Sequence, residues 1–80
     1  MRAAKLSSSL IARILYDDGQ RTLRVCFRHG LAYVYHDVPP EEYERLKTAP
    51  SPGRHYNQQI KGRYRCSFDP ERKRYGPRAA

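Results

Sequence analysis

The chain has 80 residues, of which 39% are hydrophobic and 30% are charged, and its formal net charge is +8. A chain this short holds one domain at most, with a core too thin for a deep enzyme pocket. No apolar run approaches the roughly 20 residues that span a bilayer, so neither a membrane segment nor a signal peptide is expected. Two cysteines, Cys26 and Cys66, do not make a disulfide framework, so we expect free thiols and a cytoplasmic location.

Apolar patterning predicts two strands in the first half of the fold, which we expect to begin after Ser7–Ser9. Residues 10–16 are rich in branched apolar side chains, and residues 22–28 alternate between apolar and polar side chains. The segment Asp17–Gln20 between them has the composition of a turn, in which Gly19 is able to take a positive φ. Together these segments predict an antiparallel hairpin.

A third strand is predicted over residues 31–37, and the loop before it has two alternative lengths. A two-residue loop that ends at Gly30 would pair Phe27 with Ala32. A three-residue loop, with Gly30 left-handed in a bulge, would pair Phe27 with Leu31. The difference of one residue reverses the face to which every side chain of the strand points.

The loop length decides where Tyr33 and Tyr35 lie. With the shorter loop both tyrosines lie beside Arg24 on the exposed face, where they form a base-stacking platform. With the longer loop they join the core, and Arg24 and His36 stay in solvent. We favour the longer loop because it gathers more apolar area on one side of the sheet. In that case Arg13, Arg24 and His36 form a second basic surface on the opposite face.

The segment after the third strand predicts a helix that starts near Pro40 and ends at Ala49-Pro50. Its acidic first turn suits the positive end of the helix dipole, and we expect this acidic side to face solvent. Tyr43 and Leu46 lie one turn apart and are expected to cover the sheet.

A second short helix is predicted over residues 52–59, with Ser51 as its N-cap, and residues 63–68 alternate as an edge strand would. These elements predict an α+β fold, an antiparallel three- to four-stranded meander with one or two short helices packed on one face. We assign residues 1–68 to a single domain and residues 69–80 to a basic flexible tail.

An ordered series of residues with matching gaps resembles the KTSC domain, a short domain named after the C-terminus of certain lysyl-tRNA synthetases. The series covers roughly residues 7–64 and consists of Ser8-Ser9, Tyr16-Asp17, Leu23-x-Val25-x-Phe27, Tyr33-Val34-Tyr35, Asp37-Val38-Pro39, Tyr43, Ser51-x-Gly53, Asn57, Ile60-Lys61-Gly62 and Tyr64. The chain departs from the family pattern at His55-Tyr56. The resemblance implies no catalytic residues, and the synthetase context suggests RNA binding for a family whose function is unassigned.

The positive charge is concentrated in the second half, because residues 51–80 hold eight Arg or Lys against Asp69 and Glu71. This asymmetry indicates a polyanionic partner, and nucleic acid is the commonest. Cations neutralise phosphates, aromatic rings stack on unpaired bases and amides bond to base edges. The candidate nucleic-acid-binding residues are Arg54, Tyr56, Asn57, Gln58, Lys61, Arg63, Tyr64, Arg65, Arg24, Tyr33 and Tyr35. We expect the cations among them that follow Ser51 to form one contiguous field, while Tyr56 and Tyr64 have the alternative of packing inward.

Three function classes stay open. The first is a non-catalytic nucleic-acid-binding module without a cofactor, with RNA favoured over DNA. The second is a protein-interaction module that docks on an acidic partner through an exposed strand edge. The third is a small ribonuclease of toxin type, in which His55, Lys61, Arg63 and Tyr64 would act. Three consecutive strands at the start of the chain argue against this third class.

The soft metal ligands are Cys26, His29, His36 and Cys66. Cys26 and His29 fall at an odd spacing on an alternating strand, so their side chains point apart and no metal site is expected. Catalysis by Cys26 with His36 is not expected either, because no oxyanion hole or helix N-terminus is identified near this thiol. The sequence therefore predicts a binding module rather than an enzyme, and it leaves the oligomeric state open.

Overall fold

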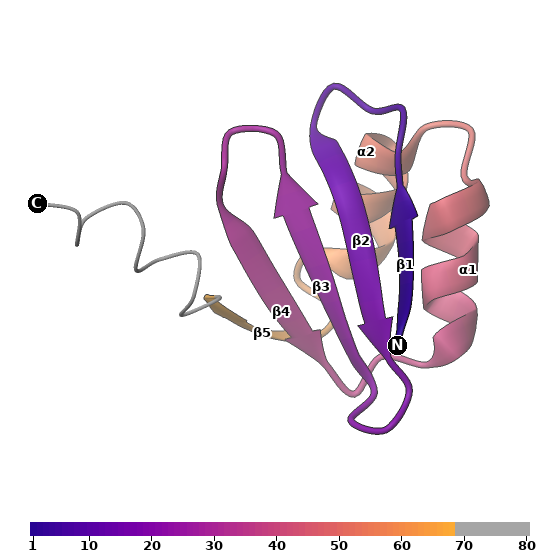
Figure 1. The fold of residues 1–80 in the computed structure, drawn as a ribbon, viewed down its shortest axis with the longest axis vertical. Coiled ribbons are helices and arrows are strands. Elements are labelled where there is room, and N and C mark those ends of the chain that lie inside the picture. The colour runs from indigo at the N-terminus through magenta and orange to yellow at the C-terminus, as the bar shows by residue number, and fades with distance from the viewer. Residues whose placement is uncertain (69–80) are drawn as a thin grey trace, which may run out of the picture.

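The computed structural model describes residues 1–68, which form an α+β fold with a five-stranded antiparallel sheet (Figure 1). The strands follow one another across the sheet in chain order, as a meander. They are β1 (Arg2–Lys5), β2 (Ile11–Asp17), β3 (Thr22–Phe27), β4 (Ala32–His36) and β5 (Arg65–Phe68). Between β4 and β5 lie α1 (Pro40–Thr48), α2 (Pro52–His55) and the π-helical turn η1 (Tyr56–Ile60). The predicted tail at residues 69–80 lies outside the described residues.

The predicted fold class is confirmed, but the sheet has one strand more than expected. Strand β1 pairs antiparallel with β2 along its whole length, from Arg2 opposite Tyr16 to Lys5 opposite Arg13. Its only apolar residues are two alanines, so the sequence pattern gave no strand signal before Ser7. Backbone pairing with the already ordered β2 is enough to extend the sheet.

The longer of the two loops connects β3 to β4, as the favoured prediction had it. Tyr33 lies opposite Val25, the Phe27 amide donates to the Leu31 carbonyl at 2.9 Å, and the Gly30 amide donates to the Phe27 carbonyl at 3.0 Å. Gly30 has φ +104°, which the bulge requires and side-chain-bearing residues avoid.

The predicted turn between β2 and β3 is present, but it does not use the conformational freedom of Gly19. The residue with positive φ is Arg21, at +57°. The Asp17 carboxylate accepts hydrogen bonds from the amides of Gly19 and Gln20, at 2.9 and 3.3 Å. This Asx-type turn fixes the first residues after β2, and the left-handed residue follows them.

Helix α1 starts at Pro40 and ends before Ala49-Pro50, close to the predicted bounds. Tyr43 and Leu46 are buried beneath the sheet, as predicted. The expectation of a fully solvent-facing acidic side was wrong at Glu42, which is only 5% exposed. This carboxylate is buried because α2 and the segment before β5 supply partners for it, as described below.

The second predicted helix is present, but it changes type midway. Ser51 holds the N-cap position without a side-chain hydrogen bond, and the four residues of α2 continue directly into η1. The Lys61 amide donates to the Tyr56 carbonyl at 2.9 Å, which is the five-residue spacing of a π-helix. Tyr56 and Ile60 are buried, so this turn is anchored to the core.

The helices lie together on one face of the sheet, which leaves the opposite face without a helical cover (Figure 1). The core lies between the two layers, and its largest fully buried side chains include Tyr16, Tyr43, Ile11, Ile14 and Leu23. The Tyr16 hydroxyl donates to the Val38 carbonyl at 2.5 Å and ties the sheet to the start of α1. None of the helices of the described part of the chain has the length and apolarity that a bilayer crossing requires.

Candidate functional site

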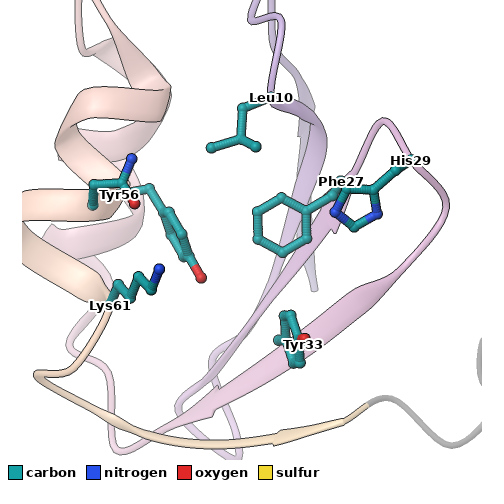
Figure 2. Close-up of a pocket in the computed structure, with 7 residues that line it drawn as sticks. Leu10, Phe27, His29, Tyr33, Tyr56 and Lys61 are labelled. Atoms are coloured by element: carbon teal, nitrogen blue, oxygen red, sulfur yellow. The ribbon is translucent and has the colours of Figure 1, made fainter.

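A pocket opens between η1 and the β3–β4 hairpin (Figure 2). It encloses about 320 Å³, at the lower end of the range of small-ligand sites. Its lining residues are Leu10, Phe27, His29, Tyr33, Tyr56, Asn57 and Lys61. Figure 2 shows Tyr56 and Lys61 pointing from the helical side toward Phe27 and Tyr33 on the sheet.

The aromatic part of the pocket follows from the register of the β3–β4 hairpin. Because Phe27 and Tyr33 lie on the same sheet face, their rings meet edge to face at 5.8 Å between centroids. Tyr56 meets Phe27 in the same manner at 5.3 Å, and the His29 ring stacks on Phe27 at 5.4 Å. Phe27 and Tyr56 are buried, so they form the floor, whereas Tyr33 is half-buried and His29 is exposed.

Tyr35 belongs to the core beneath this pocket and not to its rim. It is only 2% exposed, and its hydroxyl is hydrogen-bonded to that of Tyr56. Burial raises the pKa of both phenols, so both stay neutral and protonated at physiological pH. Of the two tyrosines expected to form a stacking platform or join the core, Tyr35 cannot present a ring face to a base. Only Tyr33 keeps an accessible edge.

Asn57 and Lys61 are the polar members of the rim that η1 supplies. Both are exposed, and within residues 1–68 neither side chain makes a hydrogen bond or an ion pair. A four-residue spacing places them on one side of η1, while Tyr56 and Ile60 occupy the buried side. The pocket therefore combines an aromatic floor with an amide and an ammonium group that are available to a ligand.

The predicted basic field is divided between the two faces of the molecule. Arg54, Lys61 and Arg63 lie on α2 and on the link to β5, and none of them pairs with a carboxylate of the described residues. The Arg63 guanidinium donates to the Gln59 amide oxygen at 3.3 Å. Arg65 lies opposite His36 in the sheet, on the helix-free face. The expectation of one contiguous field was therefore wrong for Arg65, because strand alternation turns this residue away from the others.

Tyr64 and His55 contribute to a buried cluster and not to the pocket. The Tyr64 hydroxyl donates to Glu42 Oε1 at 3.2 Å, and His55 Nε2 lies 2.7 Å from Glu42 Oε2. Burial, and next the Glu42 charge, raise the pKa of Tyr64. The inward packing that we kept as an alternative for Tyr64 is the one observed. This cluster joins α1, α2 and the segment before β5.

The remaining predicted contact residues lie away from the pocket. Gln58 is exposed on η1 but does not line it, and Arg24 is half-buried on β3, on the other sheet face. Sequence reasoning missed three lining residues, Leu10, Phe27 and His29. Phe27 had been assigned to the core alone, and His29 had been weighed only as a metal ligand. Across residues 1–68, no group of three potential ligands is placed to hold a metal ion.

The comparisons with known proteins identify the family. The KTSC domain model matches residues 7–64, so the chain belongs to the KTSC domain family. A crystal structure of a KTSC domain protein from Yersinia pestis superposes with a TM-score of 0.80 at 34% identity, and the match covers 85% of this chain and 96% of that one.

Proteins with similar sequences include a free-standing one and part of an enzyme. An uncharacterized protein of Stutzerimonas stutzeri is 43% identical over 61 residues, which cover 76% of this chain and 86% of that protein. A lysine–tRNA ligase of Nostoc punctiforme is 39% identical over 61 residues, and this match spans only 11% of the ligase. The likeness to the ligase therefore concerns one small domain of it.

Most residues that carry the family resemblance stabilise the fold, through a hydrogen bond, a backbone angle or packing in the core. The Ser8 hydroxyl accepts hydrogen bonds from the amides of Leu10 and Ile11 at 3.1 and 3.2 Å, and Gly62 takes φ +83° at the end of η1. The hydroxyl groups of Tyr16 and Tyr64 donate hydrogen bonds to the Val38 carbonyl and to the Glu42 carboxylate. Asn57 and Lys61 differ, because their exposed side chains have no such task within residues 1–68.

Proposed function

We propose that the protein is a non-catalytic module that binds single-stranded nucleic acid, with RNA favoured over DNA, through the pocket between η1 and the β3–β4 hairpin. The observation that carries this proposal is the convergence of Asn57 and Lys61 on an aromatic pocket where neither has a partner within residues 1–68. An amide bonds to a base edge, an ammonium group neutralises a phosphate, and an aromatic wall contacts the face of an unpaired base.

The charge distribution supports an anionic ligand at this pocket. The six acidic residues of the described chain lie at the β2–β3 turn, in the β4–α1 link and on α1, and none of them lines the pocket. Figure 1 shows the β2–β3 turn at the opposite end of the sheet from the β3–β4 loop that holds His29. A phosphate at Lys61 therefore meets positive side chains and no nearby carboxylate from that turn.

RNA is favoured on the strength of one relative. The lysine–tRNA ligase that contains a similar segment is, by its name, an enzyme that joins lysine to tRNA. A small domain appended to such an enzyme is well placed to hold RNA without taking part in the reaction. Free thiols at Cys26 and Cys66 suit the reducing cytoplasm, which we include in the proposal.

The proposal is tested by fluorescence anisotropy with a labelled single-stranded RNA at two salt concentrations. Replacing both Asn57 and Lys61 with Ala should weaken binding about tenfold, because a base-edge bond and a phosphate contact are lost. Each lost phosphate contact should also reduce the slope of log K against log salt by about 0.7.

Two variants serve as matched controls. Lys47→Ala removes the same charge from α1, and Gln58→Ala removes an amide from η1 outside the pocket. Each is expected to bind RNA within about twofold of the unmodified protein. Equal weakening by the controls and by the pocket variant, or affinity that does not change with salt, would contradict the proposed function.

A further inference from the structure

The sheet face opposite the helices carries one basic side chain from each strand. Lys5, Arg13, Arg24, His36 and Arg65 are these residues, and we call them the basic stripe. Their shared face follows from the strand registers, because each of them alternates with residues that face the helices. The stripe runs diagonally across the sheet and is separate from the pocket.

The stripe places like charges directly opposite each other. Lys5 lies opposite Arg13 across β1 and β2, which is a pair of like charges, and Arg65 lies opposite the imidazole of His36 across β4 and β5. Pairs of like charges destabilise an antiparallel sheet by a few tenths of a kcal/mol or more. Lys5, Arg13 and Arg65 are exposed and form no ion pair within residues 1–68. Their arrangement does not serve the stability of the free protein, which points to an anionic ligand.

One carboxylate accompanies these cations within the described strands. Asp17 is the one acidic residue in those strands, and by strand alternation it shares the sheet face of the stripe. Its carboxylate accepts hydrogen bonds from the amides of Gly19 and Gln20 in the turn after β2. His36 is bonded to the Ser67 hydroxyl at 2.9 Å, which leaves its ring on the same face. Basic groups therefore outnumber acidic ones on this face.

We propose that the basic stripe is a second nucleic-acid contact surface, which binds the phosphate backbone while the pocket takes an unpaired base. The inference rests on the proposed function in taking nucleic acid as the ligand. Neighbouring strands lie about 4.8 Å apart, so five strands present cations over about 19 Å, close to the axial rise of six nucleotides. Lys61 of the pocket and Arg65, the first residue of the edge strand β5, are four residues apart in the sequence, and an RNA that contacts both surfaces would pass round this edge of the sheet.

A phosphate backbone fits the stripe better than an acidic protein does. Three of its members are arginines, whose planar forks match phosphate oxygens in two-point contacts. A row of basic groups on neighbouring strands suits a ligand that carries a row of negative charges, as a phosphate backbone does. A contact of this kind is independent of base sequence.

The test compares two single-stranded RNA probes, one of about three nucleotides, which is too short to span the stripe, and one of about twenty. The stripe variant replaces Lys5 and Arg13 with Gln, and the control variant replaces Arg21 and Lys47 with Gln, which removes the same number of charges elsewhere. The stripe variant should bind the short probe like the unmodified protein but the long probe at least about fivefold more weakly. Its Tm should be unchanged or higher, because a like-charge pair is removed.

The outcomes separate this inference from the proposed function. If neither probe binds the unmodified protein, both proposals fail. If the short probe binds through Asn57 and Lys61 but the stripe variant keeps full affinity for the long probe, only the basic stripe is overturned. An equal loss in the control variant would also overturn it, since net charge alone would then explain the effect. The basic stripe would also be overturned if polyglutamate competed with the labelled RNA as effectively as unlabelled RNA does, because that result would indicate a surface for acidic proteins.

Discussion

At the scale of single residues, Glu42 stands out as the one charged residue that is buried within residues 1–68. It is buried at the junction of α1, α2 and the segment before β5, where His55 and Tyr64 bond to it and Arg45 lies 3.7 Å away. A buried charge is stable only while its partners are present. Glu42 therefore links the helical layer to the segment that carries Lys61 toward the pocket.

We predict that Glu42→Ala lowers the free energy of unfolding by about 2–3 kcal/mol, because it leaves the partly buried side chains of His55 and Tyr64 without their hydrogen-bond partner. The neighbouring Glu41 is exposed in the same first turn, and Glu41→Ala should cost at most about 1 kcal/mol. Urea denaturation followed by circular dichroism measures both values. Equal costs in the two variants would show that the buried cluster does not stabilise the fold.

The Tyr35–Tyr56 pair predicts how stability depends on alkaline pH. Burial raises the pKa of both phenols above the unfolded value of about 10. Above that pH the unfolded chain releases protons that the folded chain retains, so stability falls as the pH rises, by up to about 1.4 kcal/mol per pH unit for each tyrosine. Below pH 10 this contribution is fully present.

Tyr35→Phe should reduce this alkaline loss, because one of the two retained protons is gone. The measurement is the urea midpoint of both proteins at constant ionic strength between neutral pH and about pH 11. Identical pH profiles of the two proteins would contradict the assignment of these phenols to a protonated, buried pair.

At the scale of elements, the β3–β4 hairpin and η1 together create the pocket. The hairpin register places Phe27 and Tyr33 on the helical face, and η1 places Asn57 and Lys61 above them. π-Helical turns are rare and are often found at functional sites. The β3–β4 loop, which requires Gly30, therefore contributes to the pocket by fixing the register of Phe27 and Tyr33.

Gly30→Ala is predicted to destabilise the protein by about 1–2 kcal/mol, because an alanine at φ +104° is strained. Gly53 provides the comparison, since it lies within α2 at ordinary backbone angles, where an added methyl group makes only van der Waals contacts. Gly53→Ala should be neutral or slightly stabilising. Thermal unfolding of both variants checks the pair, and a harmless Gly30→Ala would argue against the three-residue loop.

The sequence was sufficient for the hairpin register, because only one loop length collects the apolar side chains on one face. It also located α1 and the edge strand β5. It did not predict η1, since π and α turns share the same composition, or β1, whose side chains carry little hydrophobic signal. The sequence predicted part of the pocket lining. Tyr33, Tyr56, Asn57 and Lys61 were named as contact residues, while Phe27 and His29 become pocket residues only through tertiary packing.

At the scale of the whole molecule, the two layers separate two kinds of surface. The helical layer holds the aromatic pocket, and the bare sheet face holds the basic stripe. Strand alternation decided this division, because it sends Arg65 to the stripe while Lys61 lines the pocket on the helical side. A charge count along the sequence cannot reveal which face a cation occupies, so the expected single field became two surfaces.

An NMR titration of the ¹⁵N-labelled protein with a short single-stranded RNA tests RNA binding at the pocket directly. We expect the largest amide shift changes to cluster at residues around the pocket, near Phe27, His29, Tyr33, Asn57 and Lys61, and we expect Asn57→Ala with Lys61→Ala to move the titration to about tenfold higher RNA concentration. Shift changes that are absent at saturating RNA, or that centre on α1 and leave the pocket unperturbed, would contradict RNA binding at the pocket.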